Sequence, residues 1–161
     1  MKRAYIAIAR GVRTFLGAIG LLRLIGRWAS RSPTGTWVRS PLSIYDFGDL
    51  LLLDVPWWTF KSAAAVTNFL DVHSGARVFE WGSGASTAWL AQRAGEVSSI
   101  EHDPAWADMV RTSIFEAKTT TADVDVRAVQ PEPANSPDAV RSGKRGFERL
   151  DFSEYVAAID E

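Results

Sequence analysis

The chain has 161 residues, a formal net charge of −1 and no cysteine, and 47% of its residues are hydrophobic. This length is typical of one ordinary domain with enough apolar residues to form a core. The lack of cysteine excludes a disulfide scaffold, a thiolate metal site and a cysteine nucleophile. Seven Trp and eight Phe argue against a disordered chain. The near-neutral charge gives no case for nucleic-acid binding.

Charge is distributed unevenly along the chain. Residues 1–45 contain eight basic residues and no acidic one, whereas residues 46–161 contain ten basic and nineteen acidic residues. A turn-rich break, Ser30–Gly35, lies inside the basic part. We therefore divide the chain into a basic, partly amphipathic helical arm with its linker, residues 1–45, and a domain, residues 46–161.

The arm is apolar over residues 4–28, with an Arg every few positions. Its longest uncharged run, Thr14–Leu22, has nine residues, and a membrane-spanning helix needs about 20. Arg10 and Arg13 interrupt the apolar core that a secretory signal requires. The arm is therefore predicted neither to span a membrane nor to be such a signal.

Three interpretations of the arm remain open. Residues 1–28 form a peripheral helix on an anionic membrane surface, with Phe15, Ile19 and Leu22 in the lipid; or they form a helix packed on the domain; or they are an organellar transit peptide. We expect a cytoplasmic protein, associated with the inner face of the membrane in the first case. The sequence does not predict an oligomeric state.

The domain alternates between predicted helices and strands. The first helix is Thr59–Val72. The strands are predicted at residues 77–81, 97–101 and 124–129, and the helices between them at residues 88–94 and 105–118. This order predicts an α/β fold with parallel strands joined by right-handed crossovers.

The last part of the domain gives weaker signals. Gln130–Pro137 is a Pro-rich loop, and Arg141–Gly146 is a basic stretch that is either a solvated loop or part of a substrate entrance. Residues 152–159 have helical apolar spacing, with Ser153 as a candidate cap. A fourth strand is the alternative there.

A glycine-containing bend follows the first strand at Gly82 and Gly84. Glycine there permits positive φ and close approach of a ligand, and the next helix N-terminus offers N–H groups to an anion. Glu101 ends the second strand, and a carboxylate at that place accepts two hydrogen bonds from a ribose diol. The site therefore suits a nucleoside that has a negative group nearby.

Two residues indicate which nucleoside. A dinucleotide fingerprint has a third glycine where this chain has Thr87. Glu80, two residues before the bend, is unfavourable beside a pyrophosphate but suits a ligand with an ammonium group. Glu80 can bind the ammonium of S-adenosylmethionine, directly or through water, while loop N–H groups and Ser86 or Thr87 bind its carboxylate. The same features disfavour an NAD-dependent oxidoreductase.

Val78–Thr87 followed by Ser99–Pro104 resembles the first two motifs of class I S-adenosylmethionine-dependent methyltransferases. Pro56–Thr59 is similar to an aromatic-Thr/Ser element that folds over the cofactor in a bacterial subgroup, so the resemblance covers about residues 55–161. It implies that Glu101 binds the ribose hydroxyls, His102 flanks the ribose or adenine, and Thr59 touches the carboxylate. The implied cofactor-binding residues are Thr59, Glu80, Gly82, Ser83, Gly84, Ser86, Thr87, Glu101 and His102.

Structural roles are the alternative for several of these residues. Gly82 and Gly84 could form only a tight turn, Glu101 could be a solvated strand end, and His102 could be an exposed or capping residue. The tryptophans Trp57, Trp58 and Trp81 favour packing over chemistry, and His73 has no assigned role.

The resemblance implies a Rossmann-like three-layer sandwich, here incomplete with about three parallel strands and preceded by the basic helical arm. It implies the cofactor-binding half of a longer enzyme, with strand Val78–Trp81 at an edge, so we expect poor stability or self-association.

The leading function is methyl transfer to a small-molecule or cell-envelope-type acceptor. The alternatives are a non-catalytic nucleoside-binding module tethered by its arm and, less favoured, an NAD-dependent oxidoreductase. No catalytic residue is predicted, and Asp103 and Asp108 lack the partners of a metal site.

Overall fold

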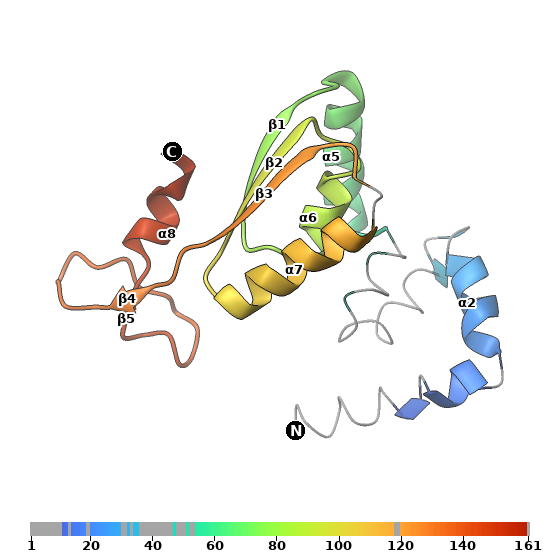
Figure 1. The fold of residues 1–161 in the computed structure, drawn as a ribbon, viewed down its shortest axis with the longest axis horizontal. Helices are drawn as coiled ribbons and strands as arrows, with labels where there is room; N and C mark the ends of the chain where they lie inside the picture. Colours follow the sequence, from blue (N-terminus) through green and yellow to red (C-terminus); the bar gives the residue numbers. More distant parts are fainter. Residues whose placement is uncertain are drawn as a thin grey trace. The chain divides into compact units, whose positions relative to one another are not determined.

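The computed structural model describes residues 54–117 and 120–160, together with residues 11–12, 14–18, 20–29, 32, 34–35, 47 and 51. The chain divides into two compact units, Met1–Val55 and Pro56–Glu161. The second unit contains the predicted strands and helices and is drawn in green to red in Figure 1.

The first unit contains α2, Leu21–Ala29, and shorter helical pieces at residues 11–12 and 14–18. Gly20 separates α2 from the preceding piece, because its φ is +73° and its N–H bonds to the carbonyl of Gly17 over 3.1 Å. Ile19 and the side chain of Leu22, both predicted to enter lipid, lie outside the described residues. Among the described helices, none has the length and apolar character needed to cross a bilayer.

The sheet of the second unit has three strands, β1 (Arg77–Trp81), β2 (Glu96–Glu101) and β3 (Asp123–Ala128). They lie in the order β1-β2-β3, and both pairs are parallel. The predicted α/β fold with three parallel strands is therefore confirmed. Glu80 pairs in register with Ser99 of β2, which pairs with Val126 of β3, so these three side chains share one face of the sheet.

Helices α5 (Phe60–Val72), α6 (Ala85–Leu90) and α7 (Pro104–Ala117) lie on that face of the sheet (Figure 1). Apolar side chains from α5, α6 and β2 form the core between these layers; its buried members are Leu70, Trp89, Leu90, Ala94 and Val97. The core therefore fixes α5 and α6 against the sheet.

Helix α6 differs from the prediction of a helix over residues 88–94. It begins at Ala85 because the side chain of Thr87 accepts the N–H of Gly84 over 2.8 Å and so closes the first turn. It ends at Leu90, whose carbonyl accepts the N–H groups of both Arg93 and Ala94 over 2.8 Å. The helix is thus shorter than predicted and lies nearer to the bend.

The C-terminal part folds back near the carboxyl end of the sheet. The predicted loop at residues 130–137 contains β4, Glu132–Pro133, which pairs antiparallel with β5, Leu150–Asp151. Helix α8, Ser153–Ala157, continues as a 3₁₀ turn and lies on the sheet side opposite α5–α7 (Figure 1). The predicted helix is confirmed, but its N-cap position is Phe152 rather than Ser153. Oδ1 of Asp151, one residue earlier, accepts the N–H of Ser153 over 2.9 Å.

Candidate functional site

The bend after β1 is built around Gly82. Its φ is +86°, and its N–H bonds to the carbonyl of Ile100 over 2.7 Å. This left-handed conformation favours glycine, so Gly82 uses the freedom that glycine permits at the bend. Gly84 does not use it, because its φ of 170° is extended backbone. A Cβ added at Gly84 would have no atom within 4 Å, so open space adjoins the loop there.

The loop is tied at one end to Glu101. The N–H of Ser83 donates to Oε2 of Glu101 over 3.1 Å, and Oε1 accepts the N–H groups of His102 and Asp103 over 2.8 and 3.1 Å. Glu101 is only 4% exposed. Its buried carboxylate therefore holds the loop after β1 against the residues that follow β2. The interpretation of Glu101 as a solvated strand end is wrong.

The other end of the loop is tied to Glu80 on β1. Its carboxylate accepts hydrogen bonds from the hydroxyls of Ser86, of Thr87 over 2.5 Å and of Ser99 over 3.0 Å. Burial raises the pKa of Glu80, the three hydroxyls oppose that rise, and the negative charge of Glu101 adds to it. A cation that reaches Glu80 would have to join or replace one of these donors.

Thr87 connects the two parts of the loop. Its hydroxyl donates to Glu80 and accepts the N–H of Gly84, and the residue has no exposed surface. Ser86, by contrast, is half-buried. Of the two hydroxyls predicted to meet a ligand carboxylate, Ser86 is thus the accessible one.

Thr59 lies apart from these residues. It is the N-cap of α5, where its Oγ1 accepts the N–H of Ser62 over 3.2 Å. The preceding Trp58 packs edge-on against Trp89 of α6, with 5.6 Å between the ring centroids. Within the part of the chain that the structure describes, no hydrogen bond joins Thr59 to the bend.

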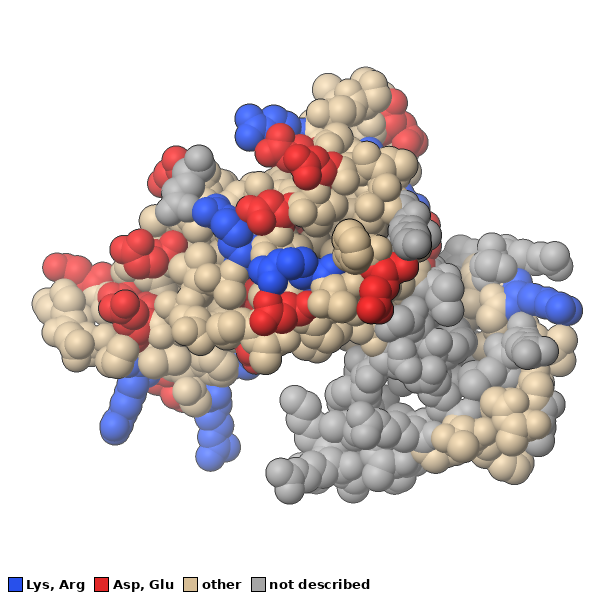
Figure 2. Space-filling view, in the orientation of Figure 1, with Lys and Arg blue, Asp and Glu red and all other residues tan. Residues whose placement is uncertain are grey.

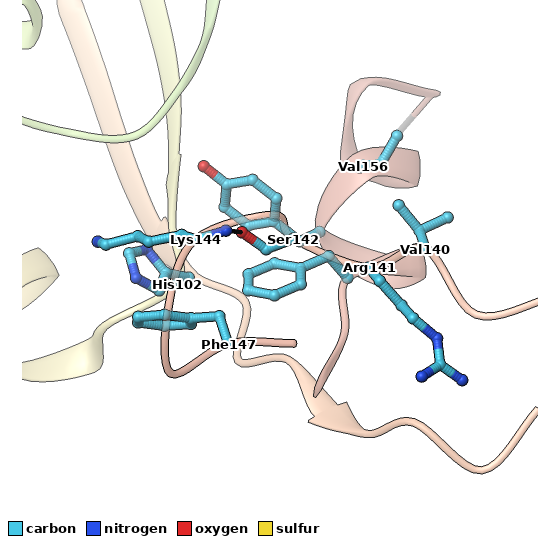
Figure 3. A pocket seen from close by; sticks show the side chains of 9 residues that line it. His102, Val140, Arg141, Ser142, Lys144, Phe147 and Val156 are labelled. Atoms are coloured by element: carbon cyan, nitrogen blue, oxygen red, sulfur yellow. Dashed lines mark hydrogen bonds between the residues drawn. The ribbon is translucent and has the colours of Figure 1, made fainter. Parts of the chain in front are cut away.

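His102 extends from the end of β2 into an aromatic cluster. Its Nδ1 lies 2.5 Å from Oε1 of Glu101, and its ring lies 5.4 Å from Phe147 and 6.3 Å from Tyr155 between centroids. The cluster borders a pocket of about 280 Å³ (Figure 3). The lining residues are His102, Val140, Arg141, Ser142, Lys144, Phe147, Phe152, Tyr155 and Val156.

This pocket adds residues that the sequence did not indicate. Phe147 and Tyr155 come from segments more than forty residues beyond His102, and the apolar spacing of residues 152–159 indicates a helix but no pocket. Arg141 and Lys144 show that the basic stretch, which was predicted to be a solvated loop or part of an entrance, borders the pocket. In Figure 3, Lys144 extends over the ring of Phe147, and its Nζ lies 4.8 Å from the ring centroid.

Tyr155 links the pocket to the bend. A Cβ at Gly82 would lie 3.9 Å from its hydroxyl. Burial, together with the charges of Glu101 and Glu80, raises the pKa of Tyr155 to about 12. The charges of both carboxylates therefore act on one hydroxyl, which lies close to Gly82.

The site thus unites most of the predicted residues, from Glu80 through the loop to Glu101 and His102, and leaves Thr59 outside. Asp103 caps α7, since its Oδ1 accepts the N–H of Ala105 over 3.0 Å. Within the described ranges, no three His, Asp or Glu residues lie close enough to hold a metal ion.

In comparisons with known proteins, the chain matches no protein-family model, no curated protein and no solved structure.

Proposed function

We propose that this chain binds S-adenosylmethionine at the Gly82 bend of a Rossmann-like fold, as the cofactor-binding part of a class I methyltransferase. One observation supports this most. The loop after β1 is bonded to Glu101 through Ser83, and the first turn of α6, which follows the loop, is bonded to Glu80 through Ser86 and Thr87. Two carboxylates therefore border the loop, which suits a ligand with a diol at one end and an ammonium group at the other.

Glu101 is suited to a ribose. A carboxylate has about four acceptor sites. Oε1 of Glu101 accepts two backbone N–H groups, and Oε2 accepts the N–H of Ser83 over 3.1 Å and, over a long 3.5 Å, its hydroxyl, which a ribose hydroxyl would replace. Its backbone donors hold the carboxylate in place, so a ribose hydroxyl meets an oriented acceptor. The adjoining pocket, with His102, Phe147 and Tyr155 in its lining, offers rings against which a planar base can stack.

Gly84 and Glu80 are suited to the amino-acid end. The open space in front of Gly84 admits a ligand close to the backbone. Burial without a cation disfavours the ionised form of Glu80 and raises its pKa. An ammonium group beside it would relieve that effect, so the charge of the ligand complements the site.

When bound, S-adenosylmethionine supplies a methyl group on a positively charged sulfur, and an acceptor displaces that sulfur. The chain has to bind, align and shield the reacting atoms, and such a displacement needs alignment of acceptor and methyl group more than a strong catalytic group. Tyr155, with a pKa of about 12, keeps its proton at neutral pH and acts as a hydrogen-bond donor rather than as a base. We propose a small-molecule or cell-envelope-type acceptor.

Calorimetric titration of the 161-residue chain with S-adenosylhomocysteine and with NAD tests the proposal. We expect binding of S-adenosylhomocysteine and none of NAD. Binding of NAD alone would overturn the proposal in favour of an oxidoreductase. An assay for transfer of labelled methyl groups to components of cell extracts distinguishes a methyltransferase from a non-catalytic nucleoside-binding module. Transfer supports the methyltransferase, whereas binding without any transfer supports the module.

A further inference from the structure

Helix α2 presents an apolar stripe to solvent. Leu21, Leu24 and Trp28 are 38%, 58% and 46% exposed. At 100° per residue these positions fall on one side of the helix. Ala29, by contrast, is buried. We call Leu21, Leu24 and Trp28 the α2 stripe.

The segment that holds the α2 stripe is basic. The first unit, Met1–Val55, has eight basic residues, all within residues 1–45, and three acidic ones, Asp46, Asp49 and Asp54, and α2 itself contains Arg27 in its last turn. The second unit is acidic, with sixteen acidic and ten basic residues between Pro56 and Glu161. On the face drawn in Figure 2, the described acidic and basic side chains of that unit are interspersed. The basic excess therefore belongs to the segment that holds the stripe.

A lipid surface with negative headgroups matches both properties. Nine residues of helix extend about 13.5 Å, which is under half of the roughly 30 Å hydrocarbon core. A short helix with an apolar stripe and basic surroundings instead lies in the plane of the interface. Tryptophan is enriched at that depth, and each Lys or Arg near an anionic surface strengthens binding about fivefold.

We propose that α2 binds the surface of an anionic lipid bilayer, with Leu21, Leu24 and Trp28 at the boundary between headgroups and acyl chains. This set differs from the predicted Phe15, Ile19 and Leu22, because that prediction treated residues 1–28 as one continuous helix. The left-handed backbone at Gly20 interrupts the helix before α2, so the apolar face of α2 is set by α2 alone. The proposal is independent of the cofactor site.

Co-sedimentation of the full chain with lipid vesicles tests this inference. The vesicles are phosphatidylcholine alone and phosphatidylcholine mixed with phosphatidylglycerol. We expect binding to the mixed vesicles, weakened by high salt, and little binding to phosphatidylcholine alone. Equal binding to both vesicles, or binding to neither, would overturn the proposal.

Two double variants locate the contact. Leu24→Ser/Trp28→Ser should bind mixed vesicles roughly tenfold or more weakly. Val72→Ser/Phe115→Ser is the control, since it removes similarly exposed apolar groups, 78% and 81% exposed, from the second unit; it should bind like the unchanged chain. Unchanged binding of the α2 variant would overturn the proposal. So would a lower melting temperature of that variant without lipid, since the stripe would then pack on the protein.

Discussion

The N–H of Ser83 donates to Oε2 of Glu101 over 3.1 Å, and this bond joins the loop after β1 to the end of β2. The indole N–H of Trp106 in α7 donates to the carbonyl of Ser83 over 2.8 Å. The backbone of Ser83 is thus held from two sides. A loop fixed in this way is preorganised for a ligand, and binding then costs less conformational entropy.

Replacing Thr87 by valine should destabilise the protein. The change keeps the shape but removes the hydroxyl that serves both Gly84 and Glu80, and a buried polar group left without its partner costs about 1–3 kcal/mol. Urea denaturation measures the loss. Thr67→Val in α5 is the control, because that hydroxyl donates to the carbonyl of Ala63 in its own helix, and the change should stay within about 0.5 kcal/mol. Equal effects of the two variants would contradict the role of Thr87.

Glu80 should make stability depend on pH in a defined direction. Burial raises the pKa of Glu80 above its ordinary value of 4.5, so the folded state binds its proton more tightly than the unfolded state. The free energy of unfolding, relative to that of Glu80→Gln, should therefore fall as pH rises from about 4.5 through the native pKa. Urea denaturation of both proteins across this range measures the difference. A difference that grows with rising pH would contradict the raised pKa.

Tyr155 should ionise later than an ordinary tyrosine. Burial and the charges of Glu101 and Glu80 raise its pKa to about 12. In a spectrophotometric titration of the folded protein, we expect a late phenolate step that is missing in Tyr155→Phe. If Tyr155→Phe instead removed a step at an ordinary tyrosine pKa, near 10, the raised pKa of Tyr155 and its burial would be contradicted.

Strand β1 should promote self-association. Within the described sheet it pairs only with β2, which leaves one row of its backbone N–H and C=O groups for another strand. Sedimentation equilibrium should show a mass that rises with concentration, and Phe79→Lys on β1 should reduce that rise. Phe69→Lys, which removes an exposed ring from α5, is the control. A monodisperse monomer with a sharp two-state melt would contradict this prediction.

The sheet could be predicted because its signals are local. β1 is a short segment, Arg77–Trp81, between Gly75 and Gly82, and its predicted bounds match the structure. Predicted β2 and β3 begin one residue late, since Glu96 and Asp123 continue the ladders although their charged side chains are atypical of strands.

The pocket could not be predicted because its walls come from distant segments. Phe147 and Tyr155 reach His102 only after β4 pairs with β5, and a two-residue strand that includes Pro133 resembles a loop in sequence. The start of α6 depended on the hydroxyl of Thr87, whose side-chain bond to Gly84 has no periodic signal. Sequence patterns therefore gave the carboxylates and the bend, while the tertiary fold supplied the covering residues.

The most direct test of the proposed cofactor site is the affinity of Gly84→Ala for S-adenosylhomocysteine. Gly84 has extended backbone and open space before it, so the methyl group should leave the melting temperature unchanged but occupy the ligand's place. Gly26→Ala in α2, where a Cβ also meets no atom within 4 Å, is the control. We predict that calorimetry shows affinity at least roughly tenfold weaker for Gly84→Ala and unchanged for Gly26→Ala. Equal affinity of both variants and the unchanged chain would contradict a cofactor at this bend.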